Sequence, residues 1–87
     1  MEQERVLNVS ELDPPGPMEK ILEAVEILTP GHYLRILHNR EPFPLYTLLD
    51  EYGYKHCIRE GKQTLFEIFV WRKDDNIAKK VVDLAMK

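Results

Sequence analysis

The 87-residue sequence contains a single cysteine, Cys57, and this scarcity excludes two kinds of site. One cysteine can form neither an intramolecular disulfide nor a zinc site built from several thiolates. Such cysteine usage fits the reducing cytoplasm, and the polar N-terminus has no apolar signal segment, so we expect a cytoplasmic protein. The longest apolar runs are far shorter than a bilayer-spanning helix, so no membrane association is expected.

Basic residues are also few, with 12 lysines and arginines against 15 aspartates and glutamates and a net charge of −3. Because no basic cluster dominates, phosphate contacts have little electrostatic support, and we expect no nucleic-acid partner. The apolar fraction of 44% is typical of a folded domain and argues against wholesale disorder. At this length we expect one domain over residues 1–87, with its core at about 5–73.

Apolar residues recur every two residues in some segments, as in strands, and every three to four residues in others, as in helices. Strands are predicted at residues 5–9, 32–38, 54–60 and 64–71, the last two forming a hairpin. Helices are predicted at residues 17–28, 44–52 and 75–86, the last one capped by Asp74, Asp75 or Asn76. This order predicts an α/β (α+β) two-layer sandwich, in which a mixed four-stranded sheet carries the first two helices on one face. The C-terminal helix is an addition to that core.

The first two helices begin with the same Pro-x-Pro pattern. Residues 12–22 read LDPPGPMEKIL and residues 41–49 read EPFPLYTLL, so Pro17 and Pro44 each fall in a first helical turn, where a missing N–H costs nothing. Loops that follow parallel strands lie along one edge of a sheet, so these two turns should be neighbours. Each helix start should also offer free N–H groups and a partial positive charge.

The edge shared by the two turns is the predicted binding surface for a small anionic ligand or a protein partner. The candidate binding residues are Asp13, Pro14, Pro17, His38, Arg40, Glu41 and Pro44. No nucleophile with an assigned base is found among them, so no catalytic residue is predicted. The alternative is that Asp13 and Glu41 serve only as turn and capping residues and that Arg40 forms a surface ion pair.

The scattered histidines and the lone cysteine carry weaker signals. His32 and His38 lie six residues apart, about 20 Å along an extended strand, so they cannot share one metal ion. Hydrogen-bonded or solvent-facing histidines are expected, with no metal site and no cofactor. Lys55 and Arg59 could lower the pKa of Cys57, but a half-buried structural thiol is favoured in the middle of a strand.

The sheet face away from the first two helices is too apolar to be left bare. The side chains expected on it are Tyr33, Leu37, Leu65, Glu67, Phe69 and Trp71. We expect the C-terminal helix to cover this face with a stripe formed by Ile77, Val81, Leu84 and Ala85. A homodimer contact through Tyr33, Phe69 and Trp71 is the alternative if the helix does not cover them.

The LDPPGP turn and the stretch HNREPFPLYTLLDEYG carry a resemblance to known families. Leu12, Pro15, Pro17 and Gly31 match the Leu-x-Cys-Pro-x-Pro and Leu-x-x-Gly pattern of the TusA/SirA-like sulfur carriers. The second stretch resembles the His-Asx-x-x-Pro-x-Pro-Leu-Tyr signature of an uncharacterised TusA-like family. The resemblance implies the strand order 1-2-4-3, with the fourth strand antiparallel to the others.

One position departs from the sulfur-carrier pattern. Pro14 stands where the carriers have the cysteine that holds a persulfide, and a proline cannot carry sulfur. We therefore expect a non-catalytic binding module. Two alternatives remain open, namely a divergent sulfur-transfer or redox protein using Cys57 and a metal- or haem-binding protein using His38 with nearby carboxylates.

Overall fold

The computed structural model describes residues 3–87, which form four strands and three helices. In chain order these are β1 (Glu4–Asn8), α1 (Gly16–Glu26), β2 (Tyr33–His38), α2 (Phe43–Glu51), β3 (Tyr54–Glu60), β4 (Phe66–Arg72) and α3 (Asn76–Ala85). The sheet has the order β1-β2-β4-β3, with β1 parallel to β2 and β4 antiparallel to both of its neighbours. This is the mixed sheet that the element order predicted and the strand order that the resemblance implied.

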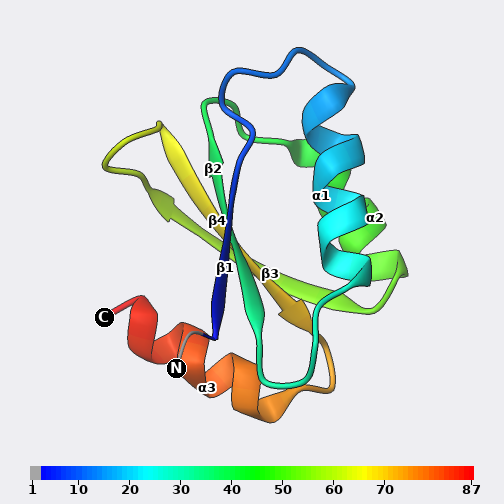
Figure 1. Ribbon diagram of the computed structural model, residues 1–87, viewed down its shortest axis with the longest axis vertical. Coiled ribbons are helices and arrows are strands. Elements are labelled where there is room, and N and C mark those ends of the chain that lie inside the picture. The colour runs from blue at the N-terminus through cyan, green and yellow to red at the C-terminus, as the bar shows by residue number, and fades with distance from the viewer. Residues whose placement is uncertain (1–2) are drawn as a thin grey trace.

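The helices lie on both faces of the sheet (Figure 1). α1 and α2 pack side by side on one face, and α3 crosses the other face near the strand ends that are remote from the two Pro-x-Pro turns. The predicted two-layer sandwich with an additional C-terminal helix is therefore confirmed. Within residues 3–87, no helix combines the length and the apolar content needed to cross a bilayer.

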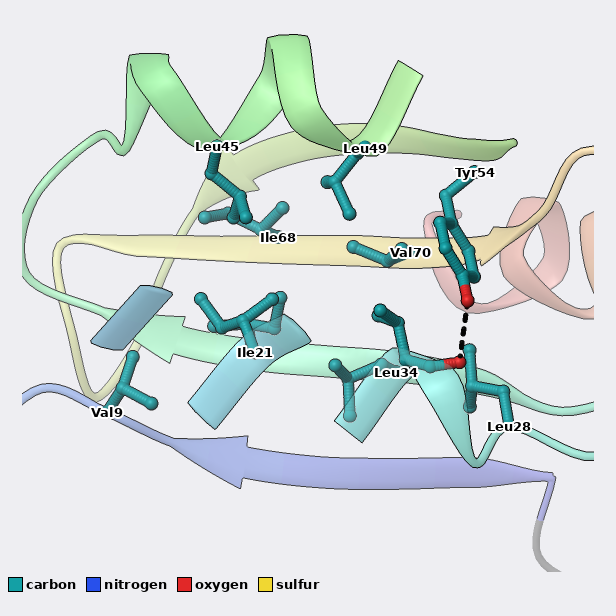
Figure 2. Packing of buried hydrophobic residues seen from close by; sticks show 11 residues of the cluster. Val9, Ile21, Leu28, Leu34, Leu45, Leu49, Tyr54, Ile68 and Val70 are labelled. Carbon is teal, nitrogen blue, oxygen red and sulfur yellow. Dashed lines mark hydrogen bonds between the residues drawn. The ribbon is translucent and has the colours of Figure 1, made fainter. Parts of the chain in front are cut away.

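The core between the sheet and the first two helices is almost entirely aliphatic (Figure 2). Ile21 from α1 and Leu45 and Leu49 from α2 point onto Ile36 and Ile68 of the central strands, and all five are fully buried. The alternation of β2 and the three-to-four-residue spacing of the helices place these side chains on facing surfaces. The hydroxyl of Tyr54 is satisfied across this core by the carbonyl oxygen of Val25, at 3.1 Å.

The opposite face is aromatic, and α3 covers it. Tyr33, Phe69 and Trp71 are buried and pack against Ala78 and Val82 of α3. The prediction that the C-terminal helix covers this face is thus confirmed. The exposed apolar face that a homodimer contact would have needed is not present within residues 3–87.

The predicted stripe on α3 was wrong at two of its four positions. Ile77 and Leu84 are 63% and 67% exposed, whereas Ala78 and Val82 are fully buried. Asp75 fixes this rotation, because its carboxylate accepts the N–H of Ala78 at 2.9 Å and the N–H of Gly31 at 2.7 Å. Of the three predicted caps, Asp75 is the one that caps the helix.

Of the other two apolar side chains predicted for this face, one is buried on it and one is exposed. Leu37 is buried and pairs across the sheet with Glu67 of the same face, although it is not part of the aromatic cluster. Leu65 is 65% exposed, because β4 begins only at Phe66. The β3–β4 turn closes tightly before it, and a side chain at Gly61 would collide with the carbonyl oxygen of Thr64.

Glu67 is a buried carboxylate on the α3 face. One of its oxygens accepts a hydrogen bond from Arg35 at 2.9 Å and the other from Arg59 at 2.9 Å. Arg35 also contacts Glu4, and Arg59 donates to the carbonyl oxygen of Ala85 at the end of α3. Only 1% of Glu67 is exposed, so this pairing compensates the cost of burying its charge.

Candidate functional site

The two Pro-x-Pro turns meet at one end of the sheet, as their positions after parallel strands predicted. In Figure 1 the β1–α1 and β2–α2 loops lie together at the end of the molecule remote from α3. Residues of both loops line a pocket of about 300 Å³ and an adjoining hollow of about 210 Å³. A volume of 300 Å³ is at the lower end of the range for pockets that hold small molecules. We call the first the proline pocket and the second the polar hollow.

Most of the predicted site residues border the proline pocket. Six of the seven line it, namely Pro14, Pro17, His38, Arg40, Glu41 and Pro44. Asp13, the seventh, lines only the polar hollow, and its backbone carbonyl oxygen accepts the N–H of Gly16 at 2.8 Å. Pro14, Pro17, His38 and Arg40 line both spaces, so the pocket and the hollow are two parts of one concave surface.

Three residues of the proline pocket, Pro15, Met18 and Pro42, were not among the seven predicted binding residues, although Pro15 and Pro42 belong to the two predicted turns. Met18 follows the helical spacing of the core, and its side chain also packs against the aliphatic core. Pro15 and Pro42 stand at the N-cap positions of α1 and α2. Their rings add apolar surface to the wall, so this space is considerably less polar than its predicted residues suggested.

The helix starts provide fewer hydrogen-bond donors than predicted. Neither α1 nor α2 has a side-chain cap, and prolines at two positions of each start remove the backbone N–H. Three further N–H groups already donate to nearby carbonyl oxygens: that of Gly16 to Asp13, that of Phe43 to Glu41 and that of Leu45 to Pro42. The prediction of free N–H groups is wrong at these positions, because the turns that build the helix starts use them.

His38 ends β2 and is the deepest polar side chain of the predicted set, with only 6% of its surface exposed. Its Nδ1 accepts the backbone N–H of Arg40 at 3.2 Å. Burial lowers the pKa of His38, and the positive charge of Arg40 lowers it further. The imidazole is therefore held in its neutral form at a pH where an exposed histidine would begin to take up a proton.

Charged groups of both signs surround the concave surface. Arg40 borders both spaces, Glu41 borders the proline pocket, and Glu11 and Asp13 border the polar hollow. Among the described residues, Arg40 forms no ion pair, so the predicted surface pairing with Glu41 or Asp13 is not made. The nearby carboxylates offset the charge of Arg40, which weakens the argument for an anion attracted by charge alone.

A stacked aromatic pair supports the α2 side of the pocket. The rings of Tyr46 and His56 are nearly parallel, with centroids 4.2 Å apart, and the Tyr46 hydroxyl donates to Glu41 at 3.4 Å. Burial raises the pKa of Tyr46 to about 12, and Glu41 adds to the effect. Tyr46 thus stays a neutral hydrogen-bond donor that orients the Glu41 carboxylate at the pocket wall.

Other chemically active side chains lie apart from the pocket. Cys57 packs under α3 on the opposite sheet face, and its burial raises its pKa, with a further contribution from Asp83. The suggestion that neighbouring cations lower this pKa was wrong, because burial outweighs the effect of Arg59. His32 bonds to Thr29 and Pro30 in an exposed loop. No three His, Cys, Asp or Glu side chains between residues 3 and 87 gather to hold a metal ion.

The pocket lies within the part of the chain that a known family describes. The model of an uncharacterised conserved protein family, DUF2249, matches residues 6–72. The chain belongs to this family. The match to DUF2249 includes all but the start of β1, runs to the end of β4 and contains both Pro-x-Pro turns, whereas α3 lies beyond it. No curated protein and no solved structure matches the chain. The predicted membership of an uncharacterised conserved family is confirmed, and DUF2249 brings no assigned chemistry with it.

Proposed function

We propose that this DUF2249 chain is a non-catalytic binding module that holds an apolar group of a small ligand or partner protein in the proline pocket. The observation that carries the proposal is the convergence of two loops, distant in sequence, on one partly enclosed space lined by proline rings and Met18. Rigid proline rings supply apolar surface that loses little conformational entropy when a ligand binds.

A non-catalytic role is favoured by the absence of an activated nucleophile at this surface. Ser10 lines the polar hollow, but its hydroxyl donates to Asn8 Oδ1 at 2.6 Å instead of facing His38. Cys57, the nucleophile of the alternative sulfur-transfer role, lies across the sheet with a raised pKa. Nucleophilic catalysis requires a base within reach of the attacking atom, and neither side chain has that arrangement.

Two larger depressions are weaker candidates. One, of about 720 Å³, lies beside the start of α3 and is bordered mostly by exposed charged and turn residues such as Lys73 and Asp74. The other, of about 530 Å³, follows the β3–β4 turn. The first has no buried polar side chain, and the buried Thr64 of the second already donates its hydroxyl to the carbonyl oxygen of Phe66, so size alone does not select either of them.

We further propose that DUF2249 shares its ancestry with the TusA/SirA-like sulfur carriers. The β-α-β-α-β-β order and the sheet order β1-β2-β4-β3 agree with what the resemblance implies for that fold. Under this proposal Pro14 replaces the sulfur-carrying cysteine, and the former reactive turn has become one wall of the proline pocket. The proposal also retains the cytoplasmic location expected from the sequence.

An NMR titration of the ¹⁵N-labelled protein tests the binding function. The probes are branched aliphatic alcohols, amides, carboxylates and amines at millimolar concentration. We expect the amide signals of Met18, His38, Arg40 and Glu41 to shift together. In Pro44→Trp an indole at the pocket wall should abolish these shifts, whereas Thr47→Trp, one turn further along α2 and exposed, should leave them intact. Shifts scattered over the whole surface, or unchanged in Pro44→Trp, would refute the proposal.

A further inference from the structure

His38 lies where the proline pocket and the polar hollow join, because it lines both of them. A neutral imidazole has one nitrogen that donates a hydrogen bond and one that accepts. Since Nδ1 accepts the N–H of Arg40, the proton of the neutral ring is on Nε2. The remaining polar atom of this nearly buried side chain is thus an N–H donor.

Nε2 has no hydrogen-bond partner in the part of the chain that the structure describes, while Nδ1 has one. Between residues 3 and 87, no fully enclosed side-chain nitrogen or oxygen lacks a partner. Nε2 must therefore retain some contact with solvent, through the spaces that His38 lines. A donor that water reaches only through a small apolar pocket binds a ligand acceptor well, because few waters compete for it.

We propose that the ligand presents an oxygen acceptor of the amide or carboxylate type to His38 Nε2–H and places a short branched apolar chain in the proline pocket. This inference rests on the binding function proposed above and names the chemical class of the ligand. The apolar chain lies against Pro17, Met18 and Pro44, and the acceptor oxygen sits at the junction with the polar hollow.

The electrostatics around His38 explain why amides and carboxylates form one class here. Burial and Arg40 lower the pKa of His38, so at neutral pH it donates a hydrogen bond without adding a charge. Arg40 attracts a carboxylate, while Asp13 and Glu41 oppose it. The choice among ligands therefore depends on whether the ligand offers a hydrogen-bond acceptor to the Nε2–H donor of His38. A protonated amine has only donors, faces another donor at Nε2, and is rejected.

Three probes of nearly equal size test this class, namely isobutyramide, isobutyrate and isobutylamine. Their affinities come from NMR titrations that follow the amides of Met18, His38, Arg40 and Glu41. We expect the amide and the carboxylate to bind about threefold to tenfold more tightly than the amine, the effect of one net hydrogen bond. The ratio of carboxylate to amide affinity then shows which of the two is the better model of the ligand, with the same bond to His38 in both.

Variants assign the preference to His38. His38→Phe keeps a planar ring without the donor, so binding of amide and carboxylate should fall to the level of the amine. His38→Gln retains a side-chain N–H and should restore the preference. His32→Phe, which changes a histidine bonded to Thr29 and Pro30 in the loop before β2, away from the pocket, should leave all three affinities unchanged.

Three results would overturn the inference. Equal affinities for the three probes, or a preference that survives in His38→Phe, would exclude the role of Nε2 while leaving the pocket a binding site. Absence of any probe from the pocket would refute the proposed function itself. If His38→Phe does not fold, imidazole ¹⁵N shifts of the unaltered protein decide: a proton on Nδ1 instead of Nε2 contradicts the inference, and an Nε2–H signal that moves with isobutyramide supports it.

Discussion

On the sheet face toward α1 and α2, the buried cluster is aliphatic apart from Tyr54. On the face toward α3, aromatic rings lie beside a buried carboxylate that two arginines hold. The first arrangement depends on filling space, and the second also depends on charge. The proline pocket lies at the end of the aliphatic face, where Met18 contributes to both the core and the pocket wall, whereas the ionic cluster joins the four strands to the end of α3 on the other face.

The largest expected effect is a test of the aliphatic face. Ile36 is fully buried on the central strand β2, so Ile36→Ala should lower the free energy of unfolding by about 3–5 kcal/mol through lost burial and a residual cavity. Urea denaturation measures this loss. Ile27→Ala removes the same atoms from a side chain that is 60% exposed, and it should change the stability by less than about 0.5 kcal/mol. Equal losses in the two variants would contradict the packing account.

Glu67→Gln tests the charged face. It should lower the free energy of unfolding by about 2–3 kcal/mol at neutral pH, because it leaves the guanidinium groups of Arg35 and Arg59 without their carboxylate. Hydrogen bonds from Arg35 and then Arg59 hold the pKa of Glu67 below its usual value of 4.5. Stability from this group is therefore complete above about pH 4.5 and is lost as the pH falls through the lower folded-state value.

Two-state denaturation curves between pH 3 and pH 7 test the Glu67 account. The difference between Glu67→Gln and the unaltered protein should shrink toward the acid end. The exposed Glu60 provides the matched control, and Glu60→Gln should show almost no difference at any pH. A Glu67→Gln deficit that is constant with pH would show that shape, and not charge, explains the burial of this side chain.

The sequence predicted the aliphatic face well and the charged face only in part. Because alternation assigned Tyr33, Phe69 and Trp71 to the other face, it left the intervening positions of β2 and β4 for the first two helices, and a period of two needs no knowledge of neighbouring strands. These positions are Leu34, Ile36, Ile68 and Val70, all of which lie in the aliphatic core. The pairing of Glu67 with arginines on two other strands depends on register, which alternation does not fix. The rotation of α3 was not predicted for a similar reason, since it depends on one long-range hydrogen bond that the Gly31 N–H donates to the Asp75 carboxylate.

The candidate site was predicted by topology more than by chemistry. The rule that loops after parallel strands share an edge brought Pro14, His38 and Pro44 together correctly. The apolar character of the pocket was not predicted, because helix-start geometry alone explains the Pro-x-Pro prolines and because Met18 fits the helical spacing of the core. One side chain can pack against the core and also line a pocket, as Met18 does. Helical periodicity does not show which part of such a side chain faces the pocket.

Asp75→Ala should lower the free energy of unfolding by a smaller amount, about 1–2 kcal/mol. It removes the cap of α3 and the hydrogen bond from Gly31 but leaves the aliphatic face unchanged. Hydrogen exchange should increase at the amides of Gly31 and Ala78 more than in β2. Asp74→Ala, at the exposed neighbouring position, is the control and should leave both rates unchanged. An equal increase throughout the sheet would mean that α3 and the aliphatic core unfold as one unit.

The smallest expected effect concerns His38, where the aliphatic face meets the pocket. Its pKa is lowered from the usual 6.5 by burial and then by Arg40, so the unfolded chain binds more protons than the folded one in the window just below pH 6.5. Stability should therefore fall as the pH drops through this window, and His38→Gln should remove part of that fall.

His56 also has a lowered pKa, again mainly through burial, so His56→Gln should remove a separate part of the fall in stability. The double variant should show the weakest dependence of stability on pH. Protonation at Nδ1 breaks the bond from the Arg40 N–H but leaves Nε2–H as a donor, and a charged ring donates more strongly. A ligand acceptor bound to Nε2–H should therefore weaken the pH dependence in the unaltered protein. A fall that is unaffected by His38→Gln would mean that solvent reaches this ring more freely than its 6% exposure implies.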